Sequence, residues 1–228
     1  MKLEWPAPRT LLTAALGIVV IAALALGGWY WWDQQQRRVA AAYAEAMTRA
    51  YAAQSPQAPL DARVRAAQDL EKVMAQYPSG AATAEAAYEL GNLRWAAQQY
   101  ASARGAYEVA VARGGSPTVR TLARTSIGYT WEAERNFPKA VDAYDAVARE
   151  LRPRDFLYEQ SLIDLARAQE LAGRTPDAIA TYQRVLKEVP AARRADEIRA
   201  RLATLGAPVP ASTPGGLAPA PSSTPPKR

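Results

Sequence analysis

An internal repeat is the feature that most constrains how this chain can fold. Residues 84–117, 124–150 and 161–190 align when a few landmark positions are superimposed. In each segment a small residue follows an apolar one, an alanine comes twelve residues later, a tyrosine four after that and a small apolar residue three further on. The landmarks are Leu90-Gly91, Ala103, Tyr107 and Ala110; Ile127-Gly128, Ala140, Tyr144 and Val147; and Leu165-Ala166, Ala178, Tyr182 and Val185. Such a period is typical of a solenoid, in which each unit buries its apolar face against the next.

The landmark pattern resembles the tetratricopeptide repeat, a helix–turn–helix unit of about 34 residues. Tyr100 and Phe137 begin the second half of the first two units, and Thr175 stands there in the third. The resemblance implies an all-α solenoid of helix pairs. The landmark alanines are 37 and 38 residues apart, with the extra residues in the turns 114–117 and 152–155, so we expect an irregular superhelix.

Small side chains at the landmarks predict close packing within each pair. Gly91, Gly128 and Ala166 let the first helix approach the second, and the landmark alanines do the same from the other side. We expect the landmark tyrosines, one turn further on, to fill the space toward the next repeat.

Proline and glycine mark the expected helix ends. Breaks at 54–59, 77–80, 114–117, 152–155 and 189–192 each contain proline, and weaker breaks precede Tyr100, Phe137 and Thr175. A degenerate fourth repeat comes first, with a helix at 36–54 and with Ala66, Leu70 and Val73 at landmark positions. Residues 191–206 predict a charged capping helix that ends at Gly206. The tetratricopeptide-repeat domain is therefore predicted at 33–206, with about four helix pairs and a cap.

An uncharged run from Thr10 to Trp32 precedes the repeats. As a helix, residues 11–32 span about 33 Å, the hydrocarbon thickness of a bilayer. The run ends in Trp29, Tyr30, Trp31 and Trp32, and such rings favour the headgroup level of a membrane. We predict a short polar head at 1–10 and a single transmembrane helix at 11–32.

A cleaved signal peptide is the alternative reading of this run. Ala23-Leu24-Ala25 fits the small-x-small cleavage pattern. However, the run is longer than the roughly 7–15 apolar residues of a signal peptide, and it continues into the aromatic cluster. The anchor is therefore the preferred interpretation.

The last residues predict a tail without a core, and the overall charge predicts a solvated helix surface. Residues 207–228 contain seven prolines and almost no large apolar side chain, which predicts a disordered tail. An aromatic-lined groove that binds this tail is the alternative to simple solvation. The net charge is +6, but acidic and basic residues alternate through the middle of the chain, so we expect a solvated helix surface and no nucleic-acid partner.

The residue types present exclude most catalytic chemistry. The chain has no Cys and no His, which removes thiol nucleophiles, disulfides, imidazole acid–base catalysis and the common zinc sites. No Asp/Glu cluster has the spacing of a calcium loop. We therefore expect no catalytic residues, no metal and no cofactor, and we interpret the protein as a non-enzyme.

The resemblance implies a protein-binding groove lined by the first helix of each pair. The corresponding positions are Glu85, Tyr88, Asn92 and Trp95 in the first unit, Thr125, Tyr129 and Glu132 in the second, and Gln160, Ile163, Arg167 and Glu170 in the third. Asn92 matches a position used by the subfamily that clamps C-terminal carboxylates. The basic partners of that clamp are absent, because Tyr88 and Glu89 stand near there, so we expect no such clamp. Packing between helices is the alternative role for Trp95 and Tyr129.

The layout of anchor, aromatic belt, Gln/Arg continuation and Ala-rich repeats resembles bacterial inner-membrane proteins of the YfgM-like type, which are ancillary to the secretory translocon. That resemblance implies an adaptor facing the periplasm that links translocon clients to chaperones. Lys and Arg near the two ends of the span do not by themselves orient it. A scaffold of an envelope complex and a cleaved, soluble periplasmic binding module are the alternatives. The sequence leaves open whether the repeats self-associate.

Overall fold

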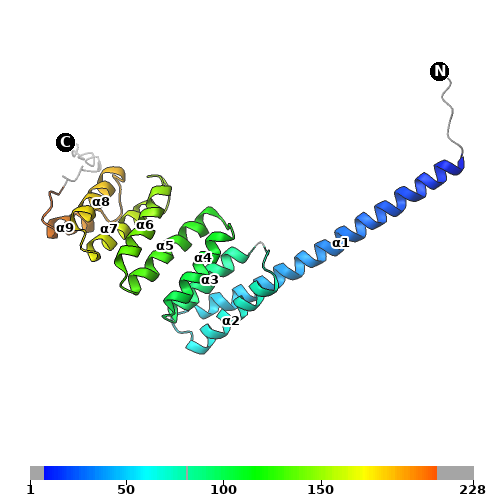
Figure 1. Cartoon of the computed structure of the whole chain (residues 1–228), viewed down its shortest axis with the longest axis horizontal. Helices are drawn as coiled ribbons and strands as arrows, with labels where there is room; N and C mark the ends of the chain where they lie inside the picture. Colours follow the sequence, from blue (N-terminus) through cyan, green and yellow to red (C-terminus); the bar gives the residue numbers. More distant parts are fainter. Residues whose placement is uncertain (1–7, 81, 210–228) are drawn as a thin grey trace, which may run out of the picture.

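In the computed structural model, which describes residues 8–80 and 82–209, the chain forms nine α-helices and no strand (Figure 1). The helices are α1 (Pro8–Ala53), α2 (Leu60–Gln76), α3 (Thr83–Ala96), α4 (Tyr100–Ala112), α5 (Pro117–Ala133), α6 (Phe137–Glu150), α7 (Tyr158–Leu171), α8 (Thr175–Glu188) and α9 (Ala195–Thr204). The predicted all-α solenoid is confirmed, and every predicted break separates two of these helices.

The helices stack in chain order as four antiparallel pairs and a cap. Each helix from α1 to α9 packs against the next, and α3 also contacts α1 and α5. The second helices of the pairs make no comparable contact with one another in the described chain, so the first helices lie on the inner side of the curve. Three apolar clusters form the core, one around α1 to α3, one around α3 to α5 and the largest from α5 to α9.

One turn geometry closes the first helix of each of the three clear repeats. Gln98, Arg135 and Gly173 occupy equivalent positions and all have positive φ, at 59°, 59° and 74°. In each case the following amide donates to a carbonyl five residues back, as in Gln99 N to Arg94 O at 2.9 Å, which is a Schellman motif. Gly206, with φ of 72°, ends α9 in the same way, as predicted.

The landmark tyrosines pack differently from the prediction. The ring of Tyr107 lies against Gly91 and that of Tyr144 against Gly128, so closely that a Cβ on either glycine would stand 2.4 Å from a ring carbon. These two tyrosines therefore pack mainly within their own helix pair. The glycines make room for the tyrosine ring as well as for the facing helix.

Helix α1 differs from the two separate helices predicted at 11–32 and 36–54. It is one helix of 46 residues, because no proline or glycine interrupts the chain between Gly28 and Ala53. A bond from Gln34 Nε2 to Tyr30 Oη (3.0 Å) and an ion pair between Arg37 and Asp33 (2.8 Å) cross the predicted junction. Residues 8–10, expected in the polar head, already belong to α1.

The first part of α1 stands clear of the repeats (Figure 1). It contains a segment long and apolar enough to cross a membrane, and none of that segment is buried. Trp29, Tyr30, Trp31 and Trp32 are 57–69% exposed. The described part of the chain thus offers no protein surface that covers these rings. Most of the predicted head (1–7) and of the predicted Pro-rich tail (210–228) lies outside the described residues.

Candidate functional site

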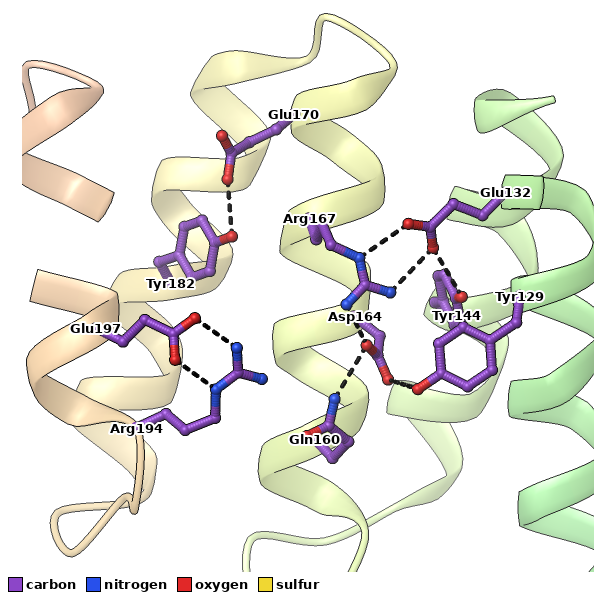
Figure 2. Close-up of polar contacts among 10 residues, drawn as sticks. All are labelled: Tyr129, Glu132, Tyr144, Gln160, Asp164, Arg167, Glu170, Tyr182, Arg194 and Glu197. Atoms are coloured by element: carbon purple, nitrogen blue, oxygen red, sulfur yellow. Dashed lines mark hydrogen bonds and ion pairs between the residues drawn. The ribbon is translucent and has the colours of Figure 1, made fainter. Parts of the chain in front are cut away.

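The inner face carries a polar network that joins the second and third clear repeats. Arg167 on α7 donates from Nε and Nη2 to the two carboxylate oxygens of Glu132 on α5, both at 2.9 Å (Figure 2). Its Nη1 donates to Asp164 Oδ1 at 2.7 Å. Asp164 also accepts from the Tyr129 hydroxyl at 2.7 Å and from Gln160 Nε2 at 3.0 Å. Four residues predicted for the groove therefore meet around one aspartate.

Burial makes this network electrostatically strong. The Asp164 side chain is fully buried, whereas that of Arg167 is 37% exposed. Hydrogen bonding to Glu132 raises the pKa of Arg167 above its usual range, against the opposing effect of burial. Burial raises the pKa of Tyr129, and its hydrogen bond to Asp164 adds to that increase. The network therefore holds two carboxylates, one guanidinium and neutral phenols in a fixed arrangement at ordinary pH.

The landmark tyrosines reach this face through their hydroxyls. Tyr144 donates to Glu132 Oε2 at 3.0 Å, and Tyr182 donates to Glu170 Oε1 at 2.7 Å. In the first clear repeat, Trp95 takes the position of these glutamates, and Tyr107 instead donates to Asn92 Oδ1 at 2.9 Å. Each second helix thus fixes the rotamer of one groove residue on its own first helix.

Helix α9 covers the end of the inner face. Arg201 on α9 donates to both carboxylate oxygens of Glu170, at 2.7 and 3.0 Å, and the backbone amide of Arg194 donates to Glu159 Oε1 at 3.2 Å. Arg194 also binds Glu197 with two bonds (Figure 2). A cavity of about 420 Å³ between α7, α8 and α9 is lined by Glu170, Arg194, Glu197, Arg201 and Ile163 among others.

Ile163 corrects the sequence prediction. It is only 4% exposed and belongs to the largest core cluster together with Ile198 of α9. The capping helix was expected to close the solenoid end, but it also lies over the inner face of α7. Ile163 is therefore a core residue and offers little surface to a ligand.

The first part of the inner face has a different character. Glu85 and Glu89 on α3 lie near Tyr51 on α1, which is 57% exposed. Burial raises the pKa of Tyr51, and the charges of Glu89 and Glu85 raise it further, which indicates that the three side chains are close. Glu89 accepts from Asn92 Nδ2 at 3.0 Å and from Gln54. Neither glutamate has an ion pair within the described residues.

The remaining predicted residues have packing contacts. Trp95 lies against Tyr100, with ring centroids 5.0 Å apart, as in the packing alternative. Tyr129 packs edge-on against Tyr144 at 5.5 Å and is half-buried. The Thr125 hydroxyl donates to the carbonyl of Thr121. All three side chains remain half-buried.

Sequence reasoning missed several members of the site. Asp164 was not assigned to the groove, although it occupies the same repeat position as Glu89 and lies three residues before Arg167. Arg194, Glu197 and Arg201 were assigned only to a capping helix. Superimposing the repeats residue by residue identifies Asp164, whereas only the docking of α9 places the other three.

Known proteins now show what this architecture is similar to. Residues 160–192, which cover α8 and all of α7 but its first two residues, match the tetratricopeptide-repeat family. The chain folds as a tetratricopeptide-repeat solenoid. No curated protein matches the sequence.

Two solved structures share the fold. One is a variant of the nearly identical tetratricopeptide-like repeats of a protein described as a kinesin light chain from Podosopora anserina. It is 19% identical, with a TM-score of 0.55 over 75% of this chain and 85% of that one. The other, a structure of the same repeats, is also 19% identical, with a TM-score of 0.52 over 75% and 92%. At this identity the likeness concerns the fold alone.

Proposed function

We propose that this protein is a membrane-anchored tetratricopeptide-repeat adaptor that binds an extended segment of a partner protein along the inner face of its solenoid. The observation that carries the proposal is the inner face itself, where half-buried tyrosines and charged side chains are held in fixed rotamers by the second helices. Preorganised polar and aromatic groups lower the cost of ordering on binding. Binding is favoured over catalysis because no side chain in this network is a nucleophile with an activating base.

The unbroken α1 supports an anchor that is retained. A cleavage site at Ala23-Leu24-Ala25 would lie inside this helix. Cleavage there would also leave the exposed rings of residues 29–32 near a new amino terminus, in water. As an anchor, the same rings take the headgroup level, and the apolar residues before them enter the hydrocarbon.

Mass analysis of the protein purified from membranes tests the anchor. We expect the intact chain, including residues 1–25, and quenching of tryptophan fluorescence by lipids brominated near the headgroup. A mature chain that starts near Leu26 contradicts the anchor and favours the soluble periplasmic binding module.

The resemblance to the YfgM-like type supports a narrower version of the proposal. In that version the anchor lies in a bacterial inner membrane, the solenoid faces the periplasm, and the partners are translocon or chaperone components. A reporter fused after Gly206 tests the orientation. Activity of a reporter that works only in the cytoplasm contradicts the periplasmic assignment.

Photo-crosslinking in cells from positions 95 and 129 tests the partner. Both side chains lie on the inner face, and a crosslinker at exposed Glu108 on the second helix α4 is the matched control. Capture of translocon or chaperone components from the inner-face positions alone supports the adaptor. Capture of only division, secretion-machine or outer-membrane-assembly proteins moves the function to an envelope scaffold, and equal capture from position 108 contradicts a specific groove.

A further inference from the structure

We propose that the first part of the inner face is a docking site for this chain's own residues 210–228, with Lys227 and Arg228 at Glu85 and Glu89. The site consists of Tyr51, Glu85, Tyr88, Glu89 and Asn92, here called the acidic patch. The proposal rests on the inner face being a peptide-binding surface. It adds a regulatory occupant that a partner protein must displace.

The two glutamates of the acidic patch lack a cation that later repeats supply. Asp164 takes the position of Glu89 in the third clear repeat, and it is neutralised by Arg167 at 2.7 Å. The residue in the position of Arg167 in the first clear repeat is Asn92, which carries no charge. Glu132 and Glu170 on the same face are likewise bound by arginines.

The unpaired negative charges of Glu85 and Glu89 are energetically unfavourable at these positions on α3. Glu85 and Glu89 are four residues apart on α3, where like charges repel. Both side chains are half-buried, and Glu85 Oε2 is a buried oxygen without a hydrogen-bond partner among the described residues. A cation placed near the two carboxylates lowers their mutual repulsion.

Two tyrosines give the acidic patch its aromatic surface. Tyr51 and Tyr88 occupy equivalent positions in the first helices of successive repeats. Tyr88 is held by the ring of Tyr107, at 5.7 Å between centroids. Aromatic grooves with neighbouring acidic groups suit proline-rich segments that carry a basic residue, because such segments lose little entropy on binding.

Residues 210–228 have the matching chemistry. They contain six of the chain's seventeen prolines, Lys227 and Arg228, and no acidic residue. The acidic patch therefore meets a segment of opposite charge whose prolines match its rings. A partner with an acidic segment would be repelled at the same place.

Residues 210–228 are also long enough to reach from the end of the solenoid to the acidic patch. The chain leaves the solenoid beside α8, where Gln183 Nε2 lies 3.4 Å from the carbonyl oxygen of Pro208. Its 19 further residues reach about 60 Å when extended as polyproline II. Five helix-to-helix steps separate α8 from α3, which is about 40–50 Å at the usual interaxial distance.

The test uses the full-length protein in lipid nanodiscs, with p-benzoylphenylalanine in place of Tyr51. We expect irradiation to join position 51 to residues 210–228 of the same molecule, identified by peptide mass mapping at monomer mobility. The double variant Lys227→Glu/Arg228→Glu and the double variant Glu85→Gln/Glu89→Gln should each lower that yield about three- to tenfold, as expected for one or two lost ion pairs. The glutamine variants retain the acceptors for Gln54 and Asn92, and circular dichroism checks that each variant is folded.

The control Glu108→Gln/Asp142→Asn removes the same charge from exposed positions on α4 and α6 and should leave the yield unchanged. No crosslink to residues 210–228, or a yield insensitive to both charge variants, overturns the proposal. A crosslink found only at dimer mobility overturns docking within one molecule. If position 51 does not crosslink to residues 210–228 but positions 95 and 129 still capture a partner, the docking proposal is wrong and the adaptor function is retained. If position 51 crosslinks to residues 210–228 but positions 95 and 129 capture no partner, the docking proposal is retained and the adaptor function is wrong.

Discussion

At the scale of single residues, Gly128 determines how closely α5 approaches α6. An added Cβ would stand 2.4 Å from a ring carbon of buried Tyr144. We expect Gly128→Ala to lower the free energy of unfolding by about 1–3 kcal/mol, because the ring has to move within a packed core. Gly105→Ala on α4 is the control: nothing lies within 4 Å of its added Cβ, so stability should stay equal or rise by up to about 1 kcal/mol. Urea unfolding followed by circular dichroism measures both.

For Gln98, which has a left-handed backbone conformation in the turn of the first clear repeat, we predict that a change to glycine raises stability. Gln98 has φ of 59° where the third repeat has Gly173 at 74°. A side chain disfavours this conformation, so Gln98→Gly should raise stability by about 0.5–1 kcal/mol. Gly173→Ala is the reciprocal control and should lower it by a similar amount. A fall in the melting temperature of the Gln98 variant contradicts this assignment of strain.

Buried tyrosines predict loss of stability in alkali. Burial raises the pKa of Tyr107, Tyr129, Tyr144 and Tyr182 above the value near 10 expected in the unfolded chain. Above pH 10 the unfolded state releases these protons while the folded state keeps them, so the free energy of unfolding should fall as pH rises. Absorbance at 295 nm against pH, with Tyr144→Phe for comparison, checks this. The variant should show a shallower decline of stability above pH 10.

At the scale of elements, Arg167 joins α5 to α7. Arg167→Met leaves the fully buried Asp164 and the half-buried Glu132 without their cation. We expect a loss of about 3–5 kcal/mol, and partial recovery when Asp164→Asn is added. Arg65→Met is the matched control, since the Arg65–Asp61 pair is exposed on one helix and should contribute less than about 1 kcal/mol. Equal effects of the two methionine variants in urea unfolding would show that the network adds little.

At the scale of the whole molecule, α1 links the apolar segment to the solenoid without a joint. Gln35→Pro breaks the helix between the apolar segment and Val39, which packs against the first core cluster, at a local cost of about 3 kcal/mol. We expect the melting temperature of the solenoid to stay the same while the distance between spin labels at positions 26 and 102 becomes broader. The absence of native Cys makes these labels specific. Gln35→Ala is the control, and an unchanged distance distribution in the proline variant contradicts a stiff connection.

Much of the fold was predictable because it depends on local signals. The breaks at proline and glycine, the repeat landmarks and the stop at Gly206 all act within a few residues of themselves, and the structure confirms them. The unbroken α1 was predicted less well, although the absence of a breaker between Gly28 and Ala53 is also visible in the sequence.

Spacing and residue type alone specify the helix pairs, their order and the aromatic end of an apolar run. Only the tertiary structure decided which groove positions are free and which are satisfied. Ile163 became core because α9 folds across α7. Asp164 binds Gln160 and Arg167 of its own helix, and it gained Tyr129 because α5 and α7 meet side by side. Within residues 8–80 and 82–209, Glu85 and Glu89 gained no cation, because the equivalent of Arg167 on their own helix is Asn92. A pairing between helices, such as that of Tyr129 with Asp164, joins residues 35 positions apart, which local pattern does not encode.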